Sequence, residues 1–325
     1  MSHPQKTCGR LLRAALPAFI IFALPFATFG YGDPGHQTVG AIADELIANS
    51  PNTAAHVRAL IGNTTLELVS IWADNAKHNL DQNDAEMMAF IRANAHPSAH
   101  DHFHYHYTNI PIQETHYRAG SVGASRSDIV HMIRNCIAIL EGQSNATNNP
   151  TGIPPKTALR LLVHYVGDIH QPLHVGAVYF RPNARPANPN TTANTKFAIG
   201  GNAINFNGTN LHSYWDTPTV RRAMANAQAQ TPRAFARVII DNPPQGWESG
   251  PFMSGWPVRW ANEMMPISTA AHNRLTFRAV SSNEWSATAA DLPAYHQWAA
   301  AQVRTGIARA GYRLAAILKK IWPET

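Results

Sequence analysis

Over much of the chain, apolar residues recur at the three- and four-residue spacing that is typical of α-helices. The final segment shows this most clearly, because Val303, Ile307 and Leu314 fall on one face of a helix. The pattern predicts helices at 37–48, 53–61, 127–141, 156–171, 219–229, 232–240, 257–271 and 295–321.

The same pattern predicts β-structure in one place. Residues 203–207 alternate between apolar and polar, follow the tripeptide G-G-N and indicate a short hairpin. Segments 142–155 and 181–195 are polar and are expected to be surface loops. No domain-scale linker and no internal repeat is found in the sequence. We therefore predict one all-α domain with a small β-hairpin insertion.

The first thirty residues differ from the rest and are typical of a secretory signal peptide. Three basic residues precede an apolar run at 16–26 that is too short to span a bilayer, and small residues follow before Tyr31. An uncleaved membrane anchor is the alternative, but the short length and two prolines within the run count against it. We expect loss of residues 1–30 to leave a domain of residues 31–325, periplasmic or secreted and without a membrane anchor.

Composition adds a reason to look for metal ions. The formal net charge is +6; residues 1–30 hold three basic and no acidic residues, so the mature chain carries 6 − 3 = +3. That charge is too small to predict nucleic-acid binding, although it does not oppose polyanionic substrates. The 17 histidines require a chemical explanation. Only Cys136 remains after cleavage, so metal ions rather than disulfides would have to stabilise an exported chain.

The stretch H-Y-V-G-D-I-H-Q-P-L-H carries the strongest chemical signal. His164 and Asp168 lie four residues apart on one helix face and can bind one ion, and the proline can turn His174 toward another. His212 and Asp216 repeat the spacing in N-L-H-S-Y-W-D. An isolated pair of this kind is more often a hydrogen bond on a helix surface. Two pairs and a further histidine in apolar sequence predict a metal site, and imidazole with carboxylate suits zinc.

Three other polar residues have ordinary structural interpretations. His36 lies at the start of a predicted helix, where a capping or surface histidine is expected. Asp74 and Lys77 lie one helical turn apart and can form a local salt bridge.

Five histidines lie between residues 96 and 106. In F-H-Y-H-Y an extended backbone would place His102, His104 and His106 on one side. The modest interpretation is a metal-buffering tract, whereas the proline that follows favours a defined turn.

Taken together, these motifs resemble the family of zinc-dependent single-strand nucleases and 3′-nucleotidases, whose fold is shared with bacterial zinc phospholipase C. The matching pieces, in the family's order, are Y-G-D-P-G-H, W-A-D-N-A-K, H-Y-T-N-I-P, H-Y-V-G-D-I-H-Q-P-L-H, G-G-N and N-L-H-S-Y-W-D. Each piece is weak, but the ordered set is specific. The resemblance implies a single helical domain of the phospholipase C/nuclease type.

The resemblance also implies three zinc ions and their ligands. The first would be bound by Asp74, His106, His164 and Asp168; the second by His36, Asp168 and the terminal amine and carbonyl of Tyr31; the third by His174, His212 and Asp216. The family begins its mature chain with Trp, so the Tyr31 side chain is expected to be secondary to its backbone groups.

Roles in catalysis and substrate binding follow from the same resemblance. Asp74, Lys77 and Asp168 would act in hydrolysis of single-stranded DNA and RNA to 5′-phosphates and of 3′-nucleotides. The substrate-binding candidates are Tyr107, Asn109 and Asn202. Asn109 replaces a carboxylate found in some members, so base preference can differ. No obligate protein partner is evident.

Two other functions remain open at this point. A lipid phosphoester hydrolase would share the fold, but Asp216 stands where the phospholipases usually have Glu. A non-catalytic periplasmic zinc-binding protein would explain the histidine-rich tract but not the spaced aspartates.

Overall fold

The computed structural model describes residues 31–96 and 100–324, so the predicted signal peptide at 1–30 lies outside the described residues. The α-helices are α1 Gly32–Ile47, α2 Pro51–Ile61, α3 Leu66–Val69, α4 Trp72–Lys77, α5 Ala85–Ala93, α6 Ile129–Leu140, α7 Pro155–Asp168, α8 Leu211–Asp216, α9 Pro218–Asn226, α10 Pro232–Ile240, α11 Trp256–Asn273 and α12 Leu292–Ile321. Short 3-10 helices are η1 His102–His106, η2 Pro172–His174, η3 Ile199–Gly201 and η4 Met253–Gly255.

The strands are short and form small sheets. They are β1 Ala95–His96, β2 His100–Asp101, β3 Ile110–Pro111, β4 Gly176–Ala177, β5 Tyr179–Phe180, β6 Lys196–Phe197, β7 Ile204–Phe206, β8 Thr209–Asn210, β9 Leu275–Ala279 and β10 Trp285–Ala289. The structure thus confirms a mainly helical fold with small β insertions. In the described part of the chain, no helix is both long and apolar enough to cross a membrane.

The predicted helices are present, with one shift that matters for the site. Helix α1 begins at Gly32, five residues before the predicted start, so His36 is buried inside the helix. The prediction of a capping or surface histidine was therefore wrong. The Y-G-D-P-G sequence indicated a turn rather than the start of a helix. Pro34 is nevertheless accommodated in the first turn of α1, where its missing N–H costs no hydrogen bond.

The hairpin after G-G-N is confirmed, since β7 pairs with β8 in antiparallel register. It belongs to a four-stranded sheet of order β8-β7-β10-β9, in which β7 runs parallel to β10. Strands β9 and β10 were missed, because that region was expected to be mostly helical. Their period-two alternation in L-T-F-R-A and W-S-A-T-A is only five residues long.

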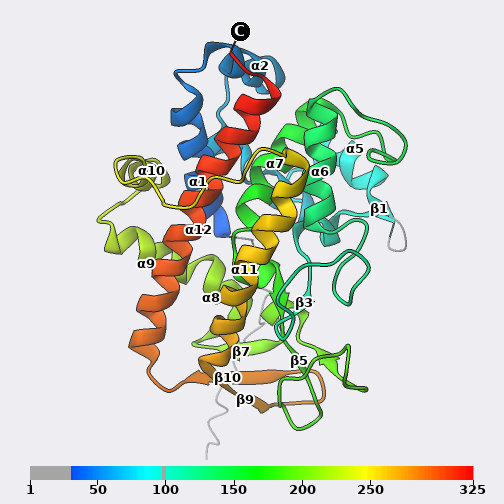
Figure 1. Ribbon diagram of the computed structural model, residues 1–325, viewed down its shortest axis with the longest axis vertical. Coiled ribbons are helices and arrows are strands. Elements are labelled where there is room, and N and C mark those ends of the chain that lie inside the picture. The colour runs from blue at the N-terminus through cyan, green and yellow to red at the C-terminus, as the bar shows by residue number, and fades with distance from the viewer. Residues whose placement is uncertain (1–30, 97–99, 325) are drawn as a thin grey trace, which may run out of the picture.

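Helices α1, α7 and α12 pack against one another, and the sheet lies at the lower end of the molecule in Figure 1. Helix α7 is buried almost all round, which explains its continuous apolar sequence. Helices α1 and α12 approach closely where Gly311 faces Ile42: a Cβ added to Gly311 would lie 2.5 Å from the Ile42 Cβ. Close packing here brings the start of α1 next to the end of α7.

We expect Gly311→Ala to destabilise the fold by about 1–3 kcal/mol, because its new methyl group overlaps Ile42. In a helix with free space, the same change would stabilise by about 1 kcal/mol. Gly255→Ala is the control, since an added Cβ there meets nothing within 4 Å. Thermal or urea unfolding measures both variants. A Gly311→Ala protein as stable as the Gly255→Ala protein would contradict the close packing.

Candidate metal centre

Three groups of buried histidine and aspartate side chains lie together in the core. Within each group the potential ligand atoms are within 4.8 Å of one another. The groups are His36, His164 and Asp168; Asp74, His106 and His164; and His174, His212 and Asp216. These residues come from six elements, α1, α4, η1, α7, η2 and α8, so the site forms only when the chain folds.

Asp168 connects the groups because its two carboxylate oxygens face different histidines. Its Oδ1 lies 3.2 Å from Nε2 of His36, whereas its Oδ2 lies 3.0 Å from Nδ1 of His106 and 3.1 Å from Nε2 of His164. The His36 and His164 rings stack with centroids 3.7 Å apart. A carboxylate placed in this way can bridge two ions.

Backbone carbonyls hold three of the rings in a defined orientation. The Nδ1 atoms of His164, His174 and His212 donate to the carbonyls of Ser70 (2.7 Å), His106 (2.7 Å) and Gly200 (2.8 Å). A carbonyl oxygen only accepts, so Nδ1 carries the hydrogen and Nε2 keeps its lone pair in the neutral ring. Second partners of this kind are typical of metal-binding histidines.

Several atoms at the centre of the cluster have no hydrogen-bond partner although they are buried. They are Nε2 of His36 and His174, Oδ1 of Asp168 and Oδ2 of Asp216. Buried polar atoms without partners are costly, and a cation would satisfy all of them. The donor set is nitrogen and oxygen only, which fits zinc, and the one described cysteine, Cys136, is buried in the apolar core.

The electrostatics of the cluster also favour a cation. Burial lowers the pKa of His106 and of His212 to about 3, so both rings are neutral near pH 7. Burial also disfavours charge on His164, but Asp168 and Asp74 outweigh it and raise the pKa of this ring to about 10. The carboxylates thus attract positive charge, which a metal ion would supply while leaving the histidine neutral as a ligand.

Lys77 ends α4, one turn after Asp74, and is half-buried. After burial, its ammonium group contributes most to lowering the pKa of His106. Lys77 is therefore close enough to act on charge at the cluster.

The third group depends on the proline that follows α7. The helix ends at Asp168, and η2 places the His174 ring next to His212, with ring centroids 4.8 Å apart. Between them, His170 faces away from the cluster: it accepts a hydrogen bond from buried Arg313, 2.8 Å away. Only two of the three histidines in this motif belong to the groups.

The F-H-Y-H-Y part of the histidine-rich tract forms the 3-10 helix η1 rather than an extended segment, so His102, His104 and His106 do not share a side. His106 points into the cluster, and His102 is buried against Phe90. His104 is largely exposed and lies 3.4 Å from Asp101. The 3-10 turn separates a candidate ligand from a surface residue two positions away.

The Tyr31 side chain is fully buried, a packing role that the sequence did not indicate. Its hydroxyl donates to the His170 carbonyl, and the ring fits where Gly35 and Gly306 have no side chain. A Cβ added to Gly35 would lie 2.5 Å from the Tyr31 Cβ. The sequence did not indicate this packing of Tyr31, because the residues around the ring come from α1, α12 and the loop after α7.

The predicted substrate-binding residues lie at the edge of the cluster. Tyr107 follows His106 and is half-buried, and the Asn109 amide oxygen lies 3.8 Å from a Cβ position built on Gly200. Asn202 donates to the Ile199 carbonyl at 2.9 Å, which places its amide nitrogen in the turn. Sequence reasoning missed Ile199, which has a positive φ of 52° although β-branched residues rarely adopt it.

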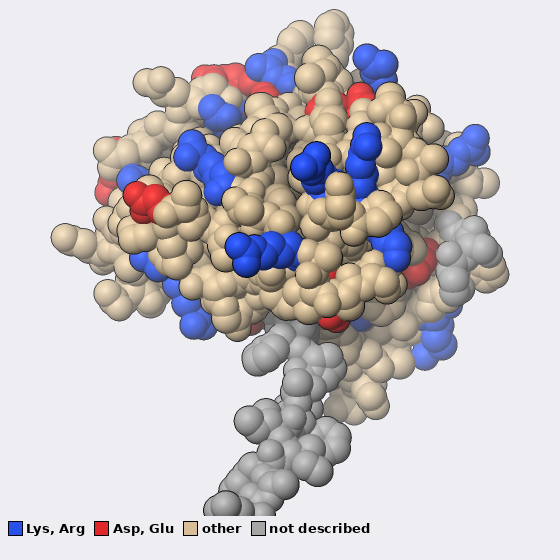
Figure 2. Space-filling model, turned by 90° about the horizontal axis from the view of Figure 1, so that it is seen from below, with Lys and Arg blue, Asp and Glu red and all other residues tan. Residues whose placement is uncertain are grey.

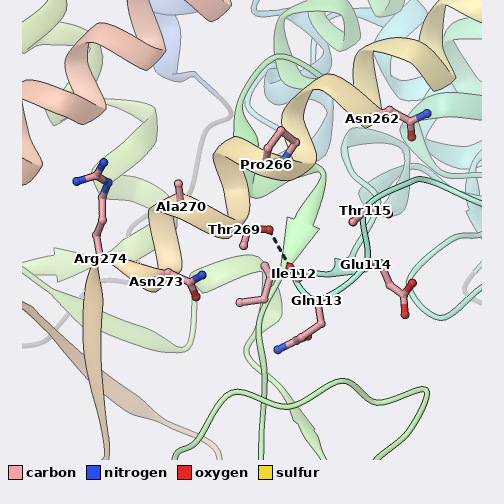
Figure 3. A pocket seen from close by; sticks show the side chains of 10 residues that line it. All are labelled: Ile112, Gln113, Glu114, Thr115, Asn262, Pro266, Thr269, Ala270, Asn273 and Arg274. Carbon is pink, nitrogen blue, oxygen red and sulfur yellow. Dashed lines mark hydrogen bonds between the residues drawn. The ribbon is translucent and has the colours of Figure 1, made fainter.

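A cavity of about 910 Å³ lies apart from this cluster, between α11 and the segment after β3 (Figure 3). Ile112, Asn262 and Arg274 are among its lining residues, and the Thr269 hydroxyl donates to the Ile112 carbonyl at 2.8 Å. None of the metal-ligand candidates lines it, so its size does not make it the reactive site.

Comparison with known proteins identifies the family of the chain. The family model described as S1/P1 Nuclease matches residues 31–323. The chain belongs to the S1/P1 nuclease family. Nuclease P1 of Penicillium citrinum is 27% identical over 308 residues, which cover 90% of this chain and 97% of that protein. Nuclease S1 of Aspergillus oryzae is 27% identical over 226 residues, or 67% of this chain and 64% of that protein. Membership of the S1/P1 nuclease family makes the chain a hydrolase of nucleic acid and confirms the resemblance.

We expect Asp168→Asn to reduce turnover and metal content far more than His104→Ala. Loss of the Asp168 charge disturbs two histidine groups, and changes even to outer partners of metal ligands cost about 10–100-fold. His104→Ala removes one exposed side chain and should stay within about twofold. Elemental analysis and initial rates test both variants. Equal losses would mean that the ligand assignment is wrong.

Proposed function

We propose that this chain is a zinc-dependent hydrolase that cleaves single-stranded DNA and RNA to 5′-phosphate products and also hydrolyses 3′-nucleotides. The position of Asp168 is the observation that carries the proposal. Its two carboxylate oxygens face separate histidines, and several buried nitrogen and oxygen atoms of the cluster have no hydrogen-bond partner. Membership of a nuclease family supports the same chemistry.

The geometric groups suggest how three zinc ions would be held. One would take Asp74, His106, His164 and Asp168; a second His36, Asp168 and the amine and carbonyl of Tyr31 after loss of residues 1–30; a third His174, His212 and Asp216. The buried Tyr31 side chain supports this scheme because it anchors the start of α1 beside His36.

Bound zinc ions would supply Lewis acidity and lower the pKa of water toward neutrality. Asp74, which faces the His106 and His164 rings at 3.7 and 3.5 Å, would orient the attacking water. Lys77 would offset negative charge that develops on the phosphoryl group. No separate general base is then required.

The edge of the cluster supports a preference for single strands. A base would lie on the partly exposed Tyr107, with Asn109 at its edge, and must leave its stack to reach that position. Ile199 is 57% exposed beside Gly200 and would offer an apolar contact to the same base. The signal-like start of the sequence supports export to the periplasm or the medium.

A substrate panel tests the reaction class and the metal together. We expect the zinc-loaded protein to release product from single-stranded DNA, RNA and 3′-AMP but not from phosphatidylcholine. Chelation should abolish activity and lower the melting temperature, since a metal bound only by the folded chain stabilises it. Preference for the lipid would favour the phospholipase alternative, and metal binding without hydrolysis would favour a zinc-binding protein. Full activity in chelator would contradict the metal mechanism.

Tyr107→Ala should raise KM for nucleotide substrates about 5- to 100-fold, because stacking contributes about 1–3 kcal/mol per base. Hydrolysis of an abasic sugar 3′-phosphate should be nearly unchanged. Phe103→Ala, which removes an exposed aromatic ring in η1, is the matched control. We also expect Asn109→Asp to change the ranking of the four bases. Equal losses on both substrates, with an unchanged base ranking, would place the base elsewhere.

A further inference from the structure

The segment between two candidate ligands, His174 and Asp216, is basic. Residues 175–215 contain Arg181, Arg185 and Lys196 and no Asp or Glu. Within the part of the chain that the structure describes, none of these three side chains forms an ion pair. Glu114 lies beside the same segment, where Asn188 and Asn190 donate to it, but it does not pair with any of the three. Basic side chains that form no ion pair leave a positive potential at the surface, which attracts polyanions.

An aromatic ring lies among these charges. Phe197 is 36% exposed and packs on Tyr179 with ring centroids 5.2 Å apart, since β5 and β6 pair these two residues directly. The Tyr179 hydroxyl donates to the Asn109 carbonyl at 3.0 Å. Tyr179 therefore links the Phe197 ring to Asn109, one of the proposed base-binding residues.

The ring lies within a few nucleotides of the proposed reaction centre. Gly200, whose carbonyl holds the His212 ring, comes three residues after Phe197, and three residues span at most about 11 Å. Stacked bases are about 3.4 Å apart along a strand. Tyr107 lies two residues before Asn109, whose carbonyl accepts a hydrogen bond from the Tyr179 hydroxyl beneath Phe197, so a strand with one base on Tyr107 can present another to Phe197.

The charges continue onto the neighbouring sheet. The Lys196 ammonium donates to the Ser282 carbonyl (2.8 Å) and to Asn283 Oδ1 (3.1 Å) in the β9–β10 turn, and Arg278 is exposed on β9. Figure 2 views the molecule from this lower end, and the charged side chains in the central part of that face are mostly Lys and Arg.

We propose that Arg181, Arg185, Lys196 and Phe197, together called the β5–β6 surface, bind the part of a single-stranded polynucleotide that extends beyond the cleaved linkage. This inference rests on the proposed function and names the length and form of the substrate. Phe197 stacks on one base, and the three basic side chains contact phosphates. A duplex keeps its bases stacked inside and offers none to the ring, so the surface selects single strands.

The experiment compares a long and a short substrate in the holoenzyme. The variants are Phe197→Ala and the double variant Arg181→Gln with Arg185→Gln. Matched controls lie on other faces: Phe252→Ala in the loop before η4, and Arg58→Gln with Arg304→Gln on α2 and α12. The substrates are a 20-nucleotide oligothymidylate and 3′-TMP, which is too short to reach the β5–β6 surface.

Phe197→Ala should raise KM for the 20-mer about tenfold and leave kcat and KM for 3′-TMP unchanged. The arginine double variant should reduce the slope of log affinity against log salt by about 1.4, or about 0.7 for each lost phosphate contact. Control variants should match the wild type on both substrates. Equal effects on both substrates, or losses no larger than those of the controls, would overturn the proposal.

Binding measured without turnover separates this inference from the proposed function. Fluorescence anisotropy with a labelled phosphorothioate 20-mer reports affinity whether or not the protein cleaves nucleic acid. Weaker binding in the β5–β6 variants of a protein that hydrolyses no substrate would reject the proposed function and keep the surface. Unchanged anisotropy in both variants would reject the surface, whatever the activity.

Discussion

Burial of carboxylates among imidazoles is the interaction on which the rest of this structure depends. Asp168 and Asp216 are almost completely buried, and the ion-pair partners of Asp168 in the described residues are histidines rather than lysines or arginines. Such a cluster is expensive to bury unless positive charge balances it. Metal ions would satisfy the cluster and link six chain segments, so binding of metal and stability of the fold would be coupled.

Glycines bring the segments close enough for this cluster to form. A Cβ on Gly167 would lie 2.7 Å from Nδ1 of His36, so the absence of a side chain lets this ring reach Asp168. Gly306 on α12 leaves room in the same way for the Tyr31 hydroxyl. The helix contacts of the core therefore determine the geometry of the ligands, which is why stability and activity should respond to the same packing changes.

The molecule separates two kinds of electrostatic environment. Negative charge is buried at the cluster, where it would hold cations, and the surface beside the cluster carries basic side chains without acidic partners. A phosphodiester chain would suit both, because bound cations would offset charge on its reacting phosphate and a positive surface would attract its other phosphates. The exposed Phe197 ring adds a contact that a simple phosphomonoester could not use.

Spacing in the sequence was enough to predict the longer helices and the hairpin, although α3 and α5 were missed. It also predicted the pairing of His164 with Asp168 and of His212 with Asp216, because those contacts lie within one helical turn. Strands β9 and β10 escaped prediction, since short strands depend on partners that lie far away in the chain.

Spacing alone did not decide which histidines gather: the family resemblance implied the three sets, and the packing of the helices brings them together. His170 and His174 lie in one motif, yet one faces Arg313 and the other His212. Buried His106 and exposed His104 are only two positions apart. Elements from distant parts of the chain likewise meet around the buried Tyr31 ring and at the basic surface around Phe197. Sequence spacing determines contacts within one element, whereas the packing of elements decides which side chains share the same buried space.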